Sequence, residues 1–235
     1  MQLKTSKELK CLSREQLLGN YKEFVLGYLL IFLFSLIGSE IIASVSDYHS
    51  TIGLILMYLL NFLLSVFLSV FDVSTSRMHL ALACGQKVKI KDIYYGFSNH
   101  LDKSLSVNFI KHFCIQICFL PSTIISFLSV ATWIKYCLYL VCLIPAIYFA
   151  LRFALVNYIL LDFPNYSVKE IFQAGKYLMK NQTKRYLYIC FSMIGLALIS
   201  VLTFGIGYLW VNVYLQMIFA NFYLNLIKTK AQHAS

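Results

Sequence analysis

Long apolar runs alternate with short polar stretches along this chain of 235 residues. Each run is close to or longer than the roughly 20 residues that an α-helix needs to cross the hydrocarbon layer of a bilayer. In runs this apolar, periodicity does not distinguish the faces of a helix well, so length and flanking charges locate the runs better. The pattern predicts an all-α, polytopic transmembrane helical bundle with six spans, at about residues 24–45, 52–71, 105–130, 136–161, 186–204 and 208–227.

Positive charge concentrates in the polar stretches between these runs. Seventeen of the twenty Lys and Arg residues fall within residues 4–22, 77–103, 169–185 and 228–230. Because cytoplasmic loops carry an excess of Lys and Arg, we expect a multi-pass protein of the cell membrane with both termini and the two longer loops in the cytoplasm. The expected division is an amphipathic N-terminal segment (1–23), a transmembrane domain (24–227) and a cytoplasmic tail (228–235). Trp133 and Trp210 fall beside predicted outer boundaries, where tryptophan is enriched.

Composition narrows the class of protein further. Charged residues make up 13% of the chain and hydrophobic residues 60%, whereas soluble domains carry about 25% charged residues. The net charge of +10 lies at predicted membrane edges, so the expected partners are anionic lipid headgroups rather than nucleic acid. Seven cysteines, an odd number and mostly within apolar runs, argue against a disulfide framework. No room remains for a soluble catalytic domain, and no familiar catalytic motif occurs, so neither enzymatic activity nor a cofactor is expected.

A short amphipathic helix is predicted between the fourth and fifth spans. Ser167 and Glu170 have the spacing of a capping box, in which each side chain accepts a hydrogen bond from the other residue's backbone. An apolar face then opposes a basic one, as in helices that lie in the membrane interface. The apolar face is Val168, Ile171, Phe172, Leu178 and Met179, and the basic face is Lys169, Lys176 and Lys180. The helix is interpreted as a membrane-surface anchor, with a gate or docking site as the alternative.

Arg152 is the cation whose position the topology does not explain. It lies ten residues before Asp162, which marks the inner edge of the fourth span, so a continuous helix would hold it about 15 Å deep in the bilayer. Charges at such depth face the bundle interior or an aqueous cavity. Asp72 and Glu40 are candidate anionic partners, and Lys111 is shallow enough to reach the interface.

Two polar stripes accompany Arg152. If the second helix continues past Phe71 toward Cys84, its stripe covers an arc of about 80°, and the stripe on the third span covers about 140°. The stripes and Arg152 would form a polar seam that opens toward the cytoplasm, either as a ligand site or simply as hydrogen bonds between helices. The first stripe is Asn61, Ser65, Ser69, Asp72, Ser76 and His79; the second is Asn108, Lys111, His112 and Gln116. The candidate ligand-binding residues are Arg152, Asp72, Asn61, His79, Lys111, His112 and Gln116.

Proline and glycine mark bends and turns. Pro121 and Pro145 lie inside the third and fourth spans and are expected to kink them. Gly205 and Gly207 are expected to permit a tight outer turn before the sixth span.

Several motifs resemble one bacterial membrane family. They are IPAI at 144–147, YILLDFP at 158–164, YLMK at 177–180 and TFGIGYLWV at 203–211, with GQKV at 85–88 and Gly96-Phe97 fitting the same pattern. The chain resembles the family called domain of unknown function 975. Two positions depart from it: Val213 stands where the family usually has proline, and Asn181 where it has glycine. The resemblance implies a six-helix membrane protein and supplies no activity and no functional residues.

Three hypotheses for function remain open. The first is a non-enzymatic membrane protein that binds or transports a small or amphipathic ligand through the seam around Arg152. The second is a protein that acts through a membrane protein partner, as an accessory subunit of an exporter or as an immunity factor against a membrane-active peptide. The third is a lipid-modifying enzyme, for which Asp72 and His79 are the acid and base to nominate.

Overall fold

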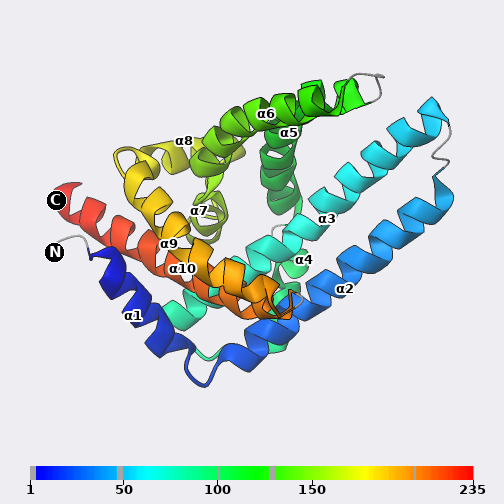
Figure 1. The fold of residues 1–235 in the computed structure, drawn as a ribbon. Coiled ribbons are helices and arrows are strands. Elements are labelled where there is room, and N and C mark those ends of the chain that lie inside the picture. Colours follow the sequence, from blue (N-terminus) through cyan, green and yellow to red (C-terminus); the bar gives the residue numbers. More distant parts are fainter. Residues whose placement is uncertain (1–3, 47–49, 100, 127–130, 204, 235) are drawn as a thin grey trace.

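Helices make up the whole architecture in the ranges that the structure covers. The computed structural model describes residues 4–46, 50–99, 101–126, 131–203 and 205–234, and each element there is helical (Figure 1). The predicted all-α class is therefore confirmed. The elements are α1 (Ser6–Leu17), α2 (Tyr21–Val45), α3 (Thr51–Ala83), the 3-10 helix η1 (Ile90–Tyr94), α4 (Tyr95–Ser98), α5 (Leu101–Ser126), α6 (Thr132–Phe153), α7 (Val156–Asp162), α8 (Val168–Met179), α9 (Thr183–Val201) and α10 (Ile206–Ala234).

Four segments are long and apolar enough to cross a membrane, and they match the first four predicted spans. They are Tyr21–Val45, Ile52–Ala83, Leu101–Ile125 and Thr132–Asp162. The second helix does continue past Phe71, as the polar stripe requires. The fifth and sixth predicted spans correspond to α9 and α10, which are not among the four, so a total of six spans stays a prediction. Residues 127–130 and 204 of the predicted spans lie outside the described residues.

Two boundaries differ from the prediction. The fourth span was expected as one helix, but α6 ends at Phe153 and α7 begins at Val156. The helix of the predicted sixth span does not end at residue 227, because α10 continues to Ala234. Both differences arise where the chain packs against other helices, which hydropathy alone does not register.

The molecule has a compact part and two extended hairpins. The hairpins α2–α3 and α5–α6 extend away from the remaining helices (Figure 1). Many of their large apolar side chains are exposed, as expected for a surface that meets lipid. In the compact part, residues 156–160 of α7 and 217–223 of α10 are all buried. Since protein surrounds the middle of α10, this helix can carry Asn and Gln, which lower its hydropathy.

Helix α1 belongs to the compact part. Its residues Leu9, Ser13 and Leu17 are buried, and the Asn221 side chain of α10 donates hydrogen bonds to Ser13 Oγ at 2.9 Å and to Gln16 Oε1 at 2.7 Å. The predicted N-terminal amphipathic segment is helical, and its apolar face packs on α10 and α3.

The two ends of the described chain lie side by side. The Lys4 backbone N–H donates to Asn225 Oδ1 at 3.1 Å, and the Arg185 side chain donates to the Lys4 carbonyl oxygen and to Asn225 Oδ1. This arrangement is compatible with the prediction that both termini face the same side of the membrane.

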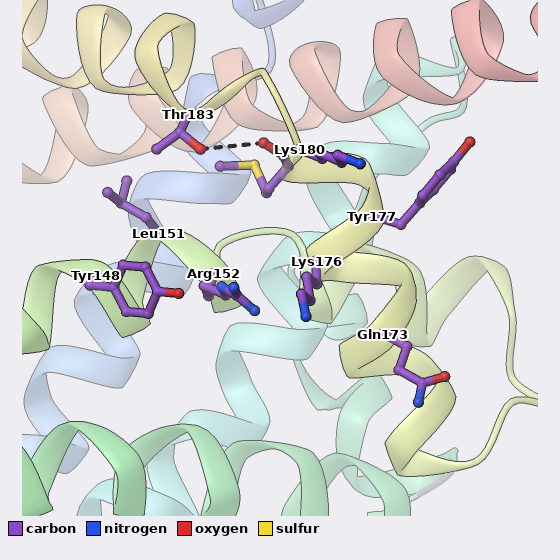
Figure 2. Close-up of a pocket in the computed structure, with 9 residues that line it drawn as sticks. Tyr148, Leu151, Arg152, Gln173, Lys176, Tyr177, Lys180 and Thr183 are labelled. Carbon is purple, nitrogen blue, oxygen red and sulfur yellow. Dashed lines mark hydrogen bonds between the residues drawn. The ribbon is translucent and has the colours of Figure 1, made fainter.

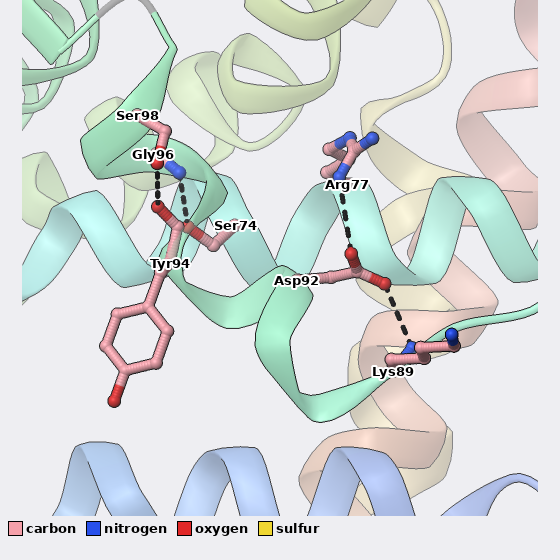
Figure 3. A network of polar contacts seen from close by, with 7 residues as sticks. All are labelled: Ser74, Arg77, Lys89, Asp92, Tyr94, Gly96 and Ser98. Atoms are coloured by element: carbon pink, nitrogen blue, oxygen red, sulfur yellow. Dashed lines mark hydrogen bonds and ion pairs between the residues drawn. The ribbon is translucent and has the colours of Figure 1, made fainter.

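The segment after α3 packs closely on that helix. Gly96 lies directly against the α3 backbone, and its N–H donates to Ser74 Oγ at 2.8 Å (Figure 3). Asp92 accepts from the Lys89 backbone N–H at 2.9 Å and lies 3.8 Å from Arg77. These contacts attach η1 and α4 to the side of α3.

The glycines around the start of α10 behave largely as the sequence predicts, whereas the kinks at Pro121 and Pro145 stay a prediction. Gly205 has φ +82°, which a tight turn between α9 and α10 requires. Gly207 instead lies where the chain passes close to α9: its N–H donates to Thr203 Oγ1 at 2.8 Å, and a Cβ would lie 2.7 Å from that oxygen. Helices α5 and α6 continue through Pro121 and Pro145.

Asn181 stands where the family usually has glycine, and the structure gives a reason why asparagine is accepted there. Asn181 has φ +65° after the end of α8. This left-handed conformation suits the glycine that the family usually has, and asparagine is among the few other residues that tolerate it.

Candidate functional site

The candidate site is built on α8, whose start is fixed by the predicted capping box. The Glu170 backbone N–H donates to Ser167 Oγ at 3.4 Å, and the Ser167 backbone N–H donates to Glu170 Oε2 at 2.7 Å. This confirms the predicted N-terminus of the helix. From this start, α8 runs with its apolar face against α6 and α7.

The apolar face of α8 is covered by protein. Ile171, Leu178 and Met179 are buried, and Gly175 approaches α7 so closely that a Cβ there would lie 3.3 Å from Val156 Cγ2. The sequence correctly predicts an amphipathic helix, and the buried residues of its apolar side pack on α6 and α7. Its role as a membrane-surface anchor stays a prediction.

Acid should weaken the attachment of α8 through its cap. Hydrogen bonds from the Ser167 backbone and hydroxyl lower the pKa of Glu170. A group with a depressed folded-state pKa contributes stability above its unfolded pKa, and this contribution is lost as the pH falls through the folded value. We expect thermal stability in detergent to fall below about pH 4 partly for this reason.

Glu170→Gln isolates that contribution. The variant should be less stable than the wild type at neutral pH, and the difference should shrink as the pH is lowered. A difference that is constant from neutral to acid pH would contradict the role of the ionised cap.

Arg152 occupies the last turn of α6, next to the break before α7. Its side chain is half-buried, and the guanidinium carbon lies 5.2 Å from the centre of the Tyr148 ring. After α7, the chain returns through residues 163–167, and α8 packs against both α6 and α7. Arg152 thus lies between α6 and the polar side of α8.

A groove runs between α6 and α8 on both sides of Arg152. One cavity has a volume of about 550 Å³ and the other about 530 Å³, and both are lined by Arg152, Gln173 and Lys176. Figure 2 shows Arg152 and Lys176 next to each other, with Tyr148 on one side and Gln173 on the other. We call this feature the α6–α8 groove. Its further lining is Tyr148, Leu151, Tyr177, Met179, Lys180 and Thr183 in the first cavity, and Ile110, Phe153, Val168, Lys169 and Phe172 in the second.

The predicted seam is brought together only in part. Asp72 Oδ2 on α3 lies 4.0 Å from Lys111 Nζ on α5, so the two polar stripes do meet at this point. Arg152 is instead among the lining residues of the α6–α8 groove, and Glu40 is exposed on α2. The anionic partner nominated for Arg152 therefore pairs with Lys111.

Most other residues of the two stripes make local contacts. Asn61 donates to the Met57 carbonyl oxygen of its own helix at 2.9 Å. His79 is fully buried, with Nδ1 2.7 Å from the Thr75 carbonyl oxygen and its ring 4.4 Å from that of Phe24 on α2. His112 is half-buried and Gln116 is exposed on α5. The helical step predicts which face these residues share, but not which neighbour each of them meets.

Sequence reasoning missed the partners of Arg152. The amphipathic pattern places Lys176 and Lys180 on the outer face of an interfacial helix, and it gives no role to Gln173 or Tyr148. The sequence does contain one usable signal, which is a glycine within the amphipathic helix. Gly175 lies one residue before Lys176, and its lack of a side chain permits close contact with α7. That contact turns the neighbouring basic residues toward Arg152.

The fold and the groove define an all-α protein with helices apolar enough to cross a membrane and a cationic groove at the end of one of them. The chain belongs to the family described as "Protein of unknown function (DUF975)", whose family model matches residues 1–230. The resemblance carried by the motifs is thereby confirmed. Comparison with curated proteins and with solved structures finds no match.

Proposed function

We propose that this protein is a non-enzymatic membrane protein that binds an amphipathic ligand in the α6–α8 groove. The observation that carries the proposal is the groove itself, whose two cavities flank Arg152 and Lys176 and have volumes typical of ligand sites. Apolar and charged side chains line the same space, which suits a molecule with an apolar part and a polar part. Transport of the ligand would be a further step beyond binding.

The geometry favours this function over a site at the Asp72–Lys111 pair. That pair satisfies its own charges across α3 and α5, whereas Arg152 lies beside a cavity. The exposed fractions of Tyr148 and Tyr177 are 53% and 64%, so the first cavity has an accessible rim. A ligand could therefore enter from the surface of the molecule.

Photocrosslinking tests the proposal on the full chain. The protein in lipid nanodiscs would be exposed to phospholipids that carry a diazirine on the acyl chain, one probe with a choline headgroup and one with a glycerol headgroup. At least one probe is expected to label residues of α6 and α8 that line the groove. Gln173→Trp should reduce this labelling by about tenfold, because position 173 lines both cavities and the larger side chain narrows each of them without changing the charge.

Gln116→Trp provides the matched control, since Gln116 is exposed on α5 and does not line the groove. It should leave the labelling of α6 and α8 unchanged. Labelling spread evenly over the exposed faces of the α2–α3 and α5–α6 hairpins, with no enrichment in the groove, would overturn the proposal.

A further inference from the structure

Four cations converge on the α6–α8 groove. Arg152 and Lys176 line both cavities, Lys180 lines the first and Lys169 lines the second. Among the lining residues of either cavity there is no Asp or Glu. The ion pairs found within the described residues are Arg77–Asp92 and Lys111–Asp72, so no carboxylate lies within 4.0 Å of any of the four cations.

The positive charges of the groove therefore have no negative partner among the described residues. Arg152 is half-buried and the three lysines are exposed, so water screens part of their mutual repulsion, which grows where a bound molecule excludes that water. An anion bound between Arg152 and Lys176 would neutralise them. Arg and Lys are the side chains that commonly bind phosphate, through the planar guanidinium fork and a compact ammonium charge.

Apolar walls adjoin the cations. Ile110, Phe153 and Phe172 line the second cavity beside Lys169, and Leu151 and Met179 line the first beside Lys180. A free inorganic anion would leave these walls in contact with water. An anion that carries hydrocarbon chains would cover them as well.

The length of α6 agrees with a ligand from the membrane. Its 22 residues extend about 33 Å, which is close to the roughly 30 Å thickness of the hydrocarbon layer. If α6 makes this crossing, Arg152 in its last turn lies at the level of the lipid headgroups. The exposed rings of Tyr148 and Tyr177 suit the same level, where an aromatic side chain meets both apolar and aqueous surroundings.

We infer that the α6–α8 groove holds an anionic phospholipid. Arg152 and Lys176 bind the phosphate of its headgroup, and an acyl chain lies against the apolar walls. This inference rests on the proposed function and specifies its ligand class. Lys180 and Lys169 add longer-range attraction at the two ends of the groove. Zwitterionic phospholipids bind more weakly, because their own cation opposes these four charges.

Binding by the full chain in a neutral detergent tests the inference. Native mass spectrometry would follow titration with phosphatidylglycerol or phosphatidylcholine, and thermal unfolding would be measured with each lipid and with inorganic phosphate. The wild type is expected to bind phosphatidylglycerol about tenfold more tightly than phosphatidylcholine. Phosphatidylglycerol should raise its unfolding temperature more than inorganic phosphate does, and added salt should weaken the effect.

Arg152→Gln combined with Lys176→Gln should remove most of this preference. Without lipid, the double variant should be at least as stable as the wild type, because it lacks the repulsion between the two cations; this result also shows that it folds. The matched control is Lys87→Gln with Lys91→Gln, which removes the same charge from exposed positions outside the groove. The control should keep the phosphatidylglycerol preference.

Either of two results in the binding experiment would overturn the inference. One is equal phosphatidylglycerol binding by the wild type and the Arg152/Lys176 double variant. The other is stabilisation by inorganic phosphate equal to that by phosphatidylglycerol, which would assign the site to a free anion. If the choline probe labels the groove as strongly as the glycerol probe, the proposed function stands and the headgroup assignment fails. If neither probe labels the groove, the proposed function itself fails.

Discussion

Gly96→Val is expected to destabilise the protein strongly, by about 3 kcal/mol or more. A Cβ at position 96 would lie 2.6 Å from the Val70 carbonyl oxygen and 2.9 Å from Ser74 Oγ. The first is a backbone atom within α3, which cannot move aside without disturbing the helix. The same shift would break the hydrogen bond from the Gly96 N–H to Ser74 Oγ (Figure 3). Loss of folded protein in detergent, or a large fall in its unfolding temperature, would be measured by fluorescence-detected thermal unfolding.

Gly195→Ala is the control for this change. No heavy atom beyond its own helix lies within 4 Å of a Cβ built at Gly195, which lies inside α9. Alanine has the higher helix propensity, so this variant should gain about 0.5–1 kcal/mol. If the Gly96 and Gly195 variants were equally stable, the close packing of the segment after α3 would be wrong.

Leu17→Ala is expected to cost about 2–5 kcal/mol, the range for truncation of a buried leucine. The Leu17 side chain is 0% exposed and belongs to a buried cluster with Phe24, Met78 and Met217. Truncation would leave a cavity where α1 meets α2, α3 and α10. Thermal unfolding would report the loss, and hydrogen exchange should become faster in the backbone of α1.

The next residue, Leu18, provides the matched control for Leu17→Ala. Leu18 is 66% exposed, so Leu18→Ala should change the stability by no more than about 0.5 kcal/mol. If α1 were only an interfacial helix that floats on the membrane, both truncations would have small and similar effects. Similar effects would therefore contradict the packing of α1 into the compact part.

The sequence predicts elements well where one residue controls a local conformation. Ser167 and Glu170 mark the start of α8, and Gly205 marks the turn before α10, because capping and positive φ depend on neighbours a few residues away. The helical step likewise predicts that Asp72 lies on the polar side of α3. Its contact with Lys111 follows once α3 and α5 pack together.

The candidate site was less predictable because it depends on how helices are brought together. The sequence predicts the depth of Arg152 from a continuous helix to Asp162. The structure instead ends α6 at Phe153 and begins α7 at Val156, within the membrane-length segment Thr132–Asp162. Basic residues of α8 then meet Arg152, although they lie 24 and 28 residues further along the chain, at Lys176 and Lys180.

By itself, the sequence determined an all-α chain with membrane-length apolar helices, the capping box of α8 and the family to which the chain belongs. Hydropathy, capping and turn chemistry are local properties, and local properties can be read from neighbouring residues. Only the tertiary structure decided that α1 and α8 pack against protein and that Arg152 shares a groove with Lys176. An amphipathic face specifies that something apolar will cover it, but lipid and protein satisfy that requirement equally. The choice depends on the contacts made by the whole fold.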